Sequence, residues 1–201
     1  MRRLVVSTFV SLDGIAQAPG GPEEDETGAF PLGGWTVPFF DESVGAFMGE
    51  FMGKPFDMVL GRRTYDIFAG FWPHASEEQG AAPLNAAIKH VASRRTPALQ
   101  WGPAELIDGD VVEGVRALKE KDGPELQVHG SIDLLQTLLP AGVADELRVL
   151  TFPVVLRQGK RLFNEGSGSA SLRLVRSSTS GTGVVMSVYE PAGEVQTGSF
   201  A

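Results

Sequence analysis

The sequence predicts an α/β fold built on a mixed, mostly parallel sheet whose C-terminal strands are antiparallel. Between residues 3 and 142, short apolar runs alternate with amphipathic helical patterns, which is typical of parallel strands joined by helices. From residue 145 onward, strand patterns follow one another with no helix between them, which indicates antiparallel strands at one edge. The length of 201 residues suits one domain. We expect that domain to span residues 1–190, with a tail over 191–201.

The first quarter of the chain predicts one strand, one long loop and one helix. Residues 3–11 are rich in β-branched side chains and predict the strand. Residues 12–37 contain glycines, prolines and the acidic run 23–26, and a loop of this length is usually a lid, a binding loop or disordered. Residues 40–53 predict an amphipathic helix, despite two internal glycines. Its apolar face contains Val44, Phe47, Met48 and Phe51.

The middle of the chain alternates strand and helix. An apolar strand over 56–60 runs into Gly61, and a helix begins at Arg62 and fades toward Pro73. Ser131 is the expected N-cap of the last helix. The further expected strands lie over 88–93, 99–101, 104–108 and 125–130, and the further helices lie over 110–123 and 131–142.

The last part of the chain predicts strands only. Residues 145–156 form an extended apolar run. Residues 171–178 and 184–190 alternate polar and apolar side chains, so they predict an antiparallel pair joined through Gly181 and Gly183.

Composition excludes several classes of protein. The absence of cysteine rules out a disulfide scaffold, thiol catalysis and thiolate metal sites, and it is typical of a reducing compartment such as the cytoplasm. A net charge of −8 argues against nucleic-acid binding, because neutralising phosphates needs a basic surface. The three histidines lack the spacing of metal ligands, and no segment has the apolar length of a membrane span. We therefore expect a cytoplasmic protein that binds a small molecule, with no metal, nucleic acid or membrane.

Three predicted strand ends carry small or basic residues where a helix would begin: Leu60–Thr64, Val91–Thr96 and Val128–Ser131. Because the carboxyl ends of parallel strands meet at one edge of a sheet, their backbone N–H groups, hydroxyls and guanidinium groups would converge on one anionic ligand. Taken alone, each is more simply a helix start flanked by solvated side chains. Their recurrence in an acidic protein favours a phosphate site, although the glycine motifs of the common dinucleotide and ATP sites are absent.

The order of five motifs resembles the dihydrofolate reductase superfamily. They are SLDG (11–14), LGRRTYDIF (60–68), VASRRT (91–96), VHGSIDLLQTLL (128–139) and ADELRVLTFPVVLRQGKRLF (144–163). The likeness is closer to the branch that contains the reductase domain of riboflavin biosynthesis, and it covers residues 2–190. It implies a three-layer αβα sandwich, an NADPH site at the carboxyl edge of the sheet, and a homodimer.

The resemblance also implies a cofactor role for nine residues, carried over by position. The first junction would meet the pyrophosphate and the adjoining adenosine phosphate, the second the adenosine 2′-phosphate, and the third the pyrophosphate and nicotinamide. The expected cofactor-binding residues are Gly61, Arg62, Thr64, Ser93, Arg94, Arg95, His129, Gly130 and Ser131. His129 replaces the first of two successive glycines that dihydrofolate reductases have there. Arg63 matches in place but has no implied role.

One departure from dihydrofolate reductases concerns the substrate. Those enzymes carry a pterin-binding carboxylate on the first helix. The equivalent position here falls near Ser43, and Asp41 and Glu42 are out of register. We therefore expect a substrate other than dihydrofolate.

The expected function is an NADPH-dependent reductase that transfers a hydride to a C=N or C=O bond. Its substrate would be small and cyclic or sugar-like, of a pterin or pyrimidine type. The candidate substrate-binding residues are Trp35, Phe39, Asp41, Phe71 and Trp72. For the aromatic residues the alternative is packing in the loop or core, and for Asp41 it is a helix N-cap. Asp13 is the candidate proton relay, with a turn residue before Gly14 as the simpler alternative.

Two other functions stay open. One is a nucleotide-binding or sensor protein that keeps the dinucleotide site without turnover. The other is an interaction module in which the 145–156 strand pairs across a dimer interface. The second leaves the arginines at the strand ends unexplained.

Overall fold

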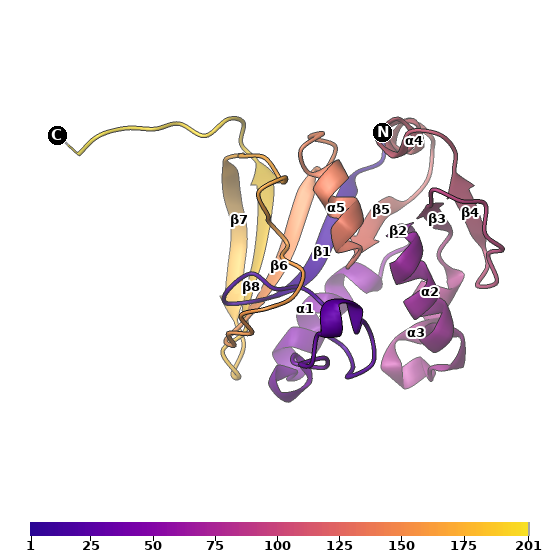
Figure 1. Ribbon diagram of the computed structural model, residues 1–201, viewed down its shortest axis with the longest axis horizontal. Coiled ribbons are helices and arrows are strands. Elements are labelled where there is room, and N and C mark those ends of the chain that lie inside the picture. The colour runs from indigo at the N-terminus through magenta and orange to yellow at the C-terminus, as the bar shows by residue number, and fades with distance from the viewer. Residues whose placement is uncertain (201) are drawn as a thin grey trace.

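The computed structural model describes residues 1–200 and contains an eight-stranded mixed sheet (Figure 1). The strands are β1 (Leu4–Ser11), β2 (Phe56–Gly61), β3 (Lys89–Ala92), β4 (Ala104–Ile107), β5 (Glu125–His129), β6 (Glu146–Phe152), β7 (Leu172–Thr179) and β8 (Val185–Pro191). Their order is β4-β3-β2-β5-β1-β6-β8-β7. Neighbours from β4 to β6 are parallel, whereas β8 is antiparallel to both β6 and β7. The predicted fold class is confirmed.

Helices cover both faces of the sheet, which gives three layers. The α-helices are α1 (Glu42–Met52), α2 (Arg62–Phe71), α3 (Ala81–Ala86), α4 (Val111–Glu120) and α5 (Ile132–Leu138). Short 3-10 helices span Thr27–Ala29, Val37–Phe39, Trp72–His74 and Glu77–Gln79. Val115 of α4 and Leu135 of α5 share a core cluster with Val6 of β1. Phe47 of α1 and Tyr65 of α2 pack in clusters on the opposite face.

The strand predicted over 99–101 is wrong. Trp101 is buried and anchors the connection between β3 and β4 through Tyr65. The Tyr65 hydroxyl accepts a hydrogen bond from the Trp101 amide at 2.7 Å and donates one to the Trp101 carbonyl at 3.1 Å. Because these backbone groups bond to a side chain, they do not enter a strand ladder.

The position of β6 contradicts the idea that residues 145–156 pair across a dimer interface. β6 lies inside the sheet between β1 and β8, so both of its edges are already hydrogen-bonded. On that side of the sheet the free edge belongs to β7, which lies beyond β8 and whose eight residues are all exposed. In Figure 1, β7 lies at the opposite end of the sheet from β4, and the segment after β8 leads away from the body of the molecule.

The long loop after β1 has a packed interior of its own. Phe30 and Trp35 are buried in the same cluster as residues of α1 and β6. The Trp35 indole donates to the Gln17 carbonyl at 2.8 Å, and the Thr36 hydroxyl donates to the Pro19 carbonyl at 2.7 Å. These contacts close the loop on itself and hold it against the carboxyl end of β1.

No helix within residues 1–200 is long and apolar enough to cross a membrane.

Candidate functional site

A cleft of about 2150 Å³ opens at the carboxyl edge of the parallel strands. Its walls come from the ends of β2, β3 and β5, from α1, and from loop residues 16–25. The cleft is lined by all nine predicted cofactor-binding residues: Gly61, Arg62, Thr64, Ser93, Arg94, Arg95, His129, Gly130 and Ser131. We call the three strand ends Gly61–Thr64, Ser93–Arg95 and Gly130–Ser131 the junction rim. The structure brings them around one space, as expected where parallel strands end.

The first and third junctions are bonded directly to each other. The Gly61 amide donates to the Ser131 hydroxyl oxygen at 3.0 Å, and the Ser131 amide donates to the Thr64 hydroxyl oxygen at 3.1 Å. Gly130 and Ser131 both have left-handed backbone conformations, with φ of 59° and 52°. A side chain at Gly130 would therefore be strained.

The predicted N-cap role of Ser131 is wrong in its chemistry. Ser131 precedes α5, but its side chain makes no cap hydrogen bond. Its hydroxyl oxygen is bonded instead to the amide at the end of β2, 70 residues away in sequence. A non-glycine residue held at positive φ is uncommon and is often found at functional sites. The serine thus ties two strand ends together rather than starting a helix.

Arg62 has a guanidinium group that is only partly used. Its Nε donates to Asp66 at 2.7 Å, one helical turn along α2. Its Nη1 is buried and has no hydrogen-bond partner among residues 1–200. A buried donor without a partner is unfavourable. Because Arg62 lines the cleft, an anion bound there would satisfy it.

Arg94 and Arg95 follow β3 and are exposed. Neither forms an ion pair within the described residues. The Ser93 hydroxyl oxygen accepts a hydrogen bond from the Arg95 amide at 3.2 Å, which shapes the turn. These two guanidinium groups are therefore available to a ligand in the cleft.

Arg63, which had no predicted role, holds the loop over the cleft. Its guanidinium lies 2.7 Å from the Asp25 carboxylate, and the Lys160 ammonium lies 3.1 Å from the same carboxylate. Burial would raise the pKa of Asp25, but hydrogen bonds from Thr27 and Lys160 outweigh it and lower the pKa to about 2. The acidic run 23–26 thus supplies an anchor that binds the loop to α2 and to the segment after β6.

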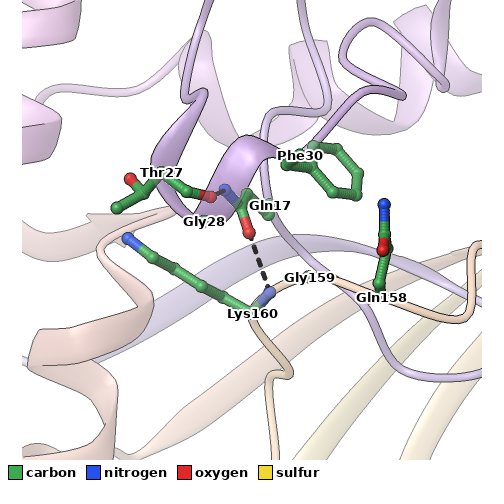
Figure 2. Close-up of a pocket in the computed structure, with 7 residues that line it drawn as sticks. All are labelled: Gln17, Thr27, Gly28, Phe30, Gln158, Gly159 and Lys160. Atoms are coloured by element: carbon green, nitrogen blue, oxygen red, sulfur yellow. Dashed lines mark hydrogen bonds between the residues drawn. The ribbon is translucent and has the colours of Figure 1, made fainter.

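Gln17 fixes the other side of this loop, as Figure 2 shows. Its amide nitrogen donates to the carbonyls of Asp25 and Thr27 at 2.9 and 2.8 Å. Its carbonyl accepts from the Lys160 amide at 3.0 Å, as the dashed line in Figure 2 marks. A pocket of about 280 Å³ lies between residues 27–30 and 158–160. It is far smaller than the cleft, and we take the cleft as the candidate site.

The predicted substrate-binding residues divide into two groups. Phe71 and Trp72 line the cleft, whereas Trp35, Phe39 and Asp41 do not. Trp35 and Phe39 pack edge-on against the ring of Phe152. The Asp41 carboxylate caps α1 by accepting the Val44 amide at 3.0 Å. The structure therefore places these three residues in their simpler alternative roles of packing and capping.

Asp13 is likewise engaged outside the cleft. Its carboxylate accepts the Ser11 hydroxyl at 2.7 Å and the amides of Leu156 and Arg157 at 3.0 and 2.8 Å. Burial would raise its pKa, but these hydrogen bonds outweigh that effect and lower the pKa to about 2. The geometry supports the turn role over the proton relay.

Sequence reasoning predicted His129 as a site residue but missed the two polar side chains beside it on the sheet beneath the cleft. Ser7 of β1 lies in register with His129 of β5 on one side and with Arg148 of β6 on the other. All three line the cleft, and we call them the polar floor. The polar side chains of Ser7 and Arg148, within strands rich in apolar residues, are the signal that could have revealed the row.

Helix α1 faces the cleft with two glycines as well as larger apolar side chains. Gly45 and Gly49, one helical turn apart, both line the cleft, and a Cβ added at either would meet nothing within 4 Å. Met48 and Met52 line it as well. The two glycines that interrupt the predicted amphipathic helix therefore leave space over the sheet.

The fold and the cleft define the class of protein as dihydrofolate-reductase-like α/β proteins. Within that class the chain belongs to the RibD C-terminal domain family, which matches residues 2–186. The resemblance predicted from the sequence motifs is confirmed.

Individual relatives agree with this assignment. The chain is 26% identical over 192 residues to the uncharacterized protein YyaP of Bacillus subtilis (strain 168), with 94% of each chain covered. A putative riboflavin biosynthesis protein from Shewanella sp. PV-4 has a similar structure, with a TM-score of 0.71, 21% identity, and coverage of 94% of this chain and 99% of that chain. Dihydrofolate reductase from Enterococcus faecalis, complexed with NADP(H), gives a TM-score of 0.60, 16% identity, and coverage of 94% and 96%. At these identities the solved structures show a shared fold.

Proposed function

We propose that this chain is an NADPH-dependent reductase that transfers a hydride to a C=N or C=O bond of a small cyclic or sugar-like substrate. Membership of the RibD C-terminal domain family supports an oxidoreductase. The main observation in favour of NADPH as the cofactor is that three arginines in the cleft have guanidinium groups without full hydrogen-bond or ion-pair partners in the described part of the chain. Arg62 has a buried donor without a partner, and Arg94 and Arg95 have no ion pair within residues 1–200.

The junction rim fits a dinucleotide. Arg62 and Thr64 would hold the pyrophosphate, with Gly61 allowing close approach of the ligand to the backbone. Ser93 and Arg94 would hold the 2′-phosphate, with Arg95 beside them. The solved dihydrofolate reductase that shares this fold was determined with NADP(H), which adds support.

When bound, NADPH supplies the hydride and with it two electrons. The chain's own contribution is to orient the two reactants and keep the space between them dry. The hydride goes to the carbon of the C=N or C=O bond, and the heteroatom takes a proton. Residues of α1 that line the cleft are glycine, methionine and phenylalanine, so this helix offers no acid. In this proposal a water molecule supplies that proton.

A non-catalytic dinucleotide sensor is the second candidate. The same absence of an ionisable α1 side chain from the cleft favours it. The involvement of Asp13 in the turn that follows β1 points the same way. A sensor would bind NADPH in the junction rim without oxidising it.

Titration with NADPH and with NADH, followed by tryptophan fluorescence, tests the cofactor. Trp72 lines the cleft and is partly exposed, so its emission should respond to a bound nicotinamide nucleotide. We expect NADPH to bind more tightly than NADH. Failure of both to bind below millimolar concentration would make the cofactor assignment wrong. A substrate screen that follows loss of NADPH absorbance then separates a reductase from a sensor.

We also propose that the protein is a homodimer that uses the β7 edge. Every residue of this strand is exposed, and Leu172, Leu174 and Val175 present apolar side chains on it. Exposed apolar edges of this kind invite pairing with another chain. Light scattering after size-exclusion chromatography should give twice the monomer mass, and Leu174→Lys should reduce it to the monomer value.

A further inference from the structure

The polar floor is the part of the cleft that the dinucleotide proposal leaves unexplained. Ser7, His129 and Arg148 lie side by side on three adjacent strands and line the cleft beneath α1. An imidazole and a guanidinium on the buried face of a sheet need hydrogen-bond partners. Those partners determine what the floor presents to a ligand.

A chain of hydrogen bonds runs along the floor from Arg148 to His129. Arg148 Nη1 and Nη2 each lie 3.1 Å from one oxygen of Glu125, a bidentate pair, and its Nε donates to Glu146 at 2.5 Å. The Gln127 amide nitrogen donates to Glu125 at 2.8 Å. The Gln127 carbonyl oxygen lies 2.8 Å from His129 Nε2.

This chain fixes which nitrogen of His129 carries the proton. The Glu125 carboxylate acts as an acceptor, because both of its oxygens are bonded to the Arg148 guanidinium, which can only donate. The group of Gln127 that faces it must therefore be the NH₂ group. Its carbonyl oxygen is then turned to His129 and also only accepts. Nε2 of His129 must consequently carry the hydrogen, which leaves Nδ1 as a lone pair.

His129 Nδ1 has no hydrogen-bond partner among residues 1–200, although the residue lines the cleft. Burial lowers the pKa of His129 to about 4, and the charge of Arg148 adds to that effect. The imidazole is therefore neutral at physiological pH, which agrees with the hydrogen-bond pattern. An unpaired acceptor at the floor of a cleft is a recognition group for a ligand's donor.

We propose that His129 binds the substrate, with Nδ1 accepting a hydrogen bond from a ring N–H or an O–H of the small molecule. This inference rests on the proposed reductase function and narrows the substrate to a ring that carries a donor at that point. Gln127 acts through His129 as a positioning residue. The Ser7 hydroxyl lies beside the same position and can donate to or accept from the same ring.

Nitrogen-15 NMR of the histidine rings tests the first part without any ligand. The protein has three histidines, and exposed His74 and buried His90 serve as internal references. We expect His129 to appear as the neutral Nε2–H form at pH 7. Gln127→Met should convert it to a mixture of both neutral forms, whereas a mutation that only loosened the fold would also move His90. An Nδ1–H ring or a charged ring in the wild-type protein would overturn the proposal.

A matched pair of probes tests the ligand contact. Uracil carries ring N–H donors, and 1,3-dimethyluracil has the same ring with both donors blocked. We expect uracil, in the presence of NADP⁺, to move the His129 Nδ1 signal, and dimethyluracil to leave it in place. An Nδ1 signal that stays unmoved by uracil up to its solubility limit, or that moves equally with both, would overturn the contact.

The two proposals fail separately. If NADPH does not bind, the reductase function is wrong, while the ring form of His129 is still measured on the free protein. If NADPH binds and His129 carries its proton on Nδ1, only the substrate contact is wrong. His129→Asn, which can place an acceptor near the former Nδ1, should retain the preference for uracil over dimethyluracil. His129→Leu should abolish that preference.

Discussion

The junction rim and the polar floor line the same cleft but differ in how they relate to the fold. The rim leaves Arg94 and Arg95 exposed and without ion pairs within residues 1–200. On the floor, Arg148 is 5% exposed and bonded to two carboxylates. Removing an exposed arginine without an ion pair costs the fold little, whereas removing one that pairs with buried carboxylates leaves those charges uncompensated and costs much. Within this one cleft, the residues positioned to bind a ligand therefore differ from the residues that stabilise the fold.

The largest expected effect is the loss of folding stability when Arg148 of the polar floor is replaced. Arg148→Met leaves Glu125 without its cation and leaves Glu146 with only the partly exposed Arg3, and breaking a buried pair from one side costs about 3–5 kcal/mol. Urea unfolding measures this loss. Adding Glu125→Gln and Glu146→Gln to the same chain should recover part of it, because no charge is then left unpaired. If the single variant loses less than about 1 kcal/mol of unfolding free energy, Arg148 contributes no more than a surface arginine, and the proposed difference between rim and floor is wrong.

The next largest effect is the loss of folding stability that His129 of the polar floor should cause at low pH. The folded-state pKa of His129 lies near 4, below the ordinary value of 6.5, because burial disfavours the charged ring. The stability it contributes is complete above about pH 6.5 and is lost as the pH falls toward 4. Each unit of pKa difference is about 1.4 kcal/mol, so we expect a loss of roughly 2–3 kcal/mol.

Denaturant unfolding at pH 7 and pH 4 measures that loss, and His129→Asn serves as the control because it removes the titrating group. The wild-type protein should lose more stability over this interval than the variant. His90, whose pKa is also lowered by burial, titrates in both proteins and cancels. Equal losses would show that His129 is not held neutral by the fold.

Substitutions in the junction rim should change the affinity for the nucleotide and leave the free energy of unfolding unchanged. Arg94→Ala removes the proposed charged hydrogen bond to the 2′-phosphate, which would be worth about 1.5–3 kcal/mol, or roughly a 10- to 150-fold weaker affinity for NADPH. Affinity for NADH and the unfolding midpoint should stay unchanged. Fluorescence titration with both nucleotides checks this. Equal weakening of NADPH and NADH would contradict the assignment of Arg94 to the 2′-phosphate.

The smallest effect concerns the helix that roofs the floor. Gly49→Ala adds a methyl group that meets nothing within 4 Å, and alanine is favoured over glycine in a helix by about 0.5–1 kcal/mol. We expect the unfolding free energy to rise by that amount. Gly53→Ala is the contrasting control, since its Cβ would lie 2.9 Å from the Gly49 carbonyl oxygen. A destabilised Gly49→Ala would mean that α1 approaches the sheet more closely than the structure indicates.

The sequence was sufficient to predict the rim because each junction is local. A strand, a glycine or serine and a basic residue stand within a few positions of one another, as in Gly61–Thr64. The floor could not be predicted in this way. Ser7, His129 and Arg148 come together only through the order β5-β1-β6 and its register, which residues far apart in the chain determine. The predictions for Trp35 and Asp41 missed the cleft because a loop's path is set by its own packing.

The bonds between Gly61, Thr64 and Ser131 make two loops behave mechanically as one. A phosphate bound by one loop would contact a structure that is already ordered in the folded protein, so binding would cost little conformational entropy of the loops. Because these bonds link the two junctions, Thr64→Val and Ser131→Ala should each change ligand binding at both junctions. Their effects on binding free energy should therefore not add. The pair therefore acts as a single preorganised clamp.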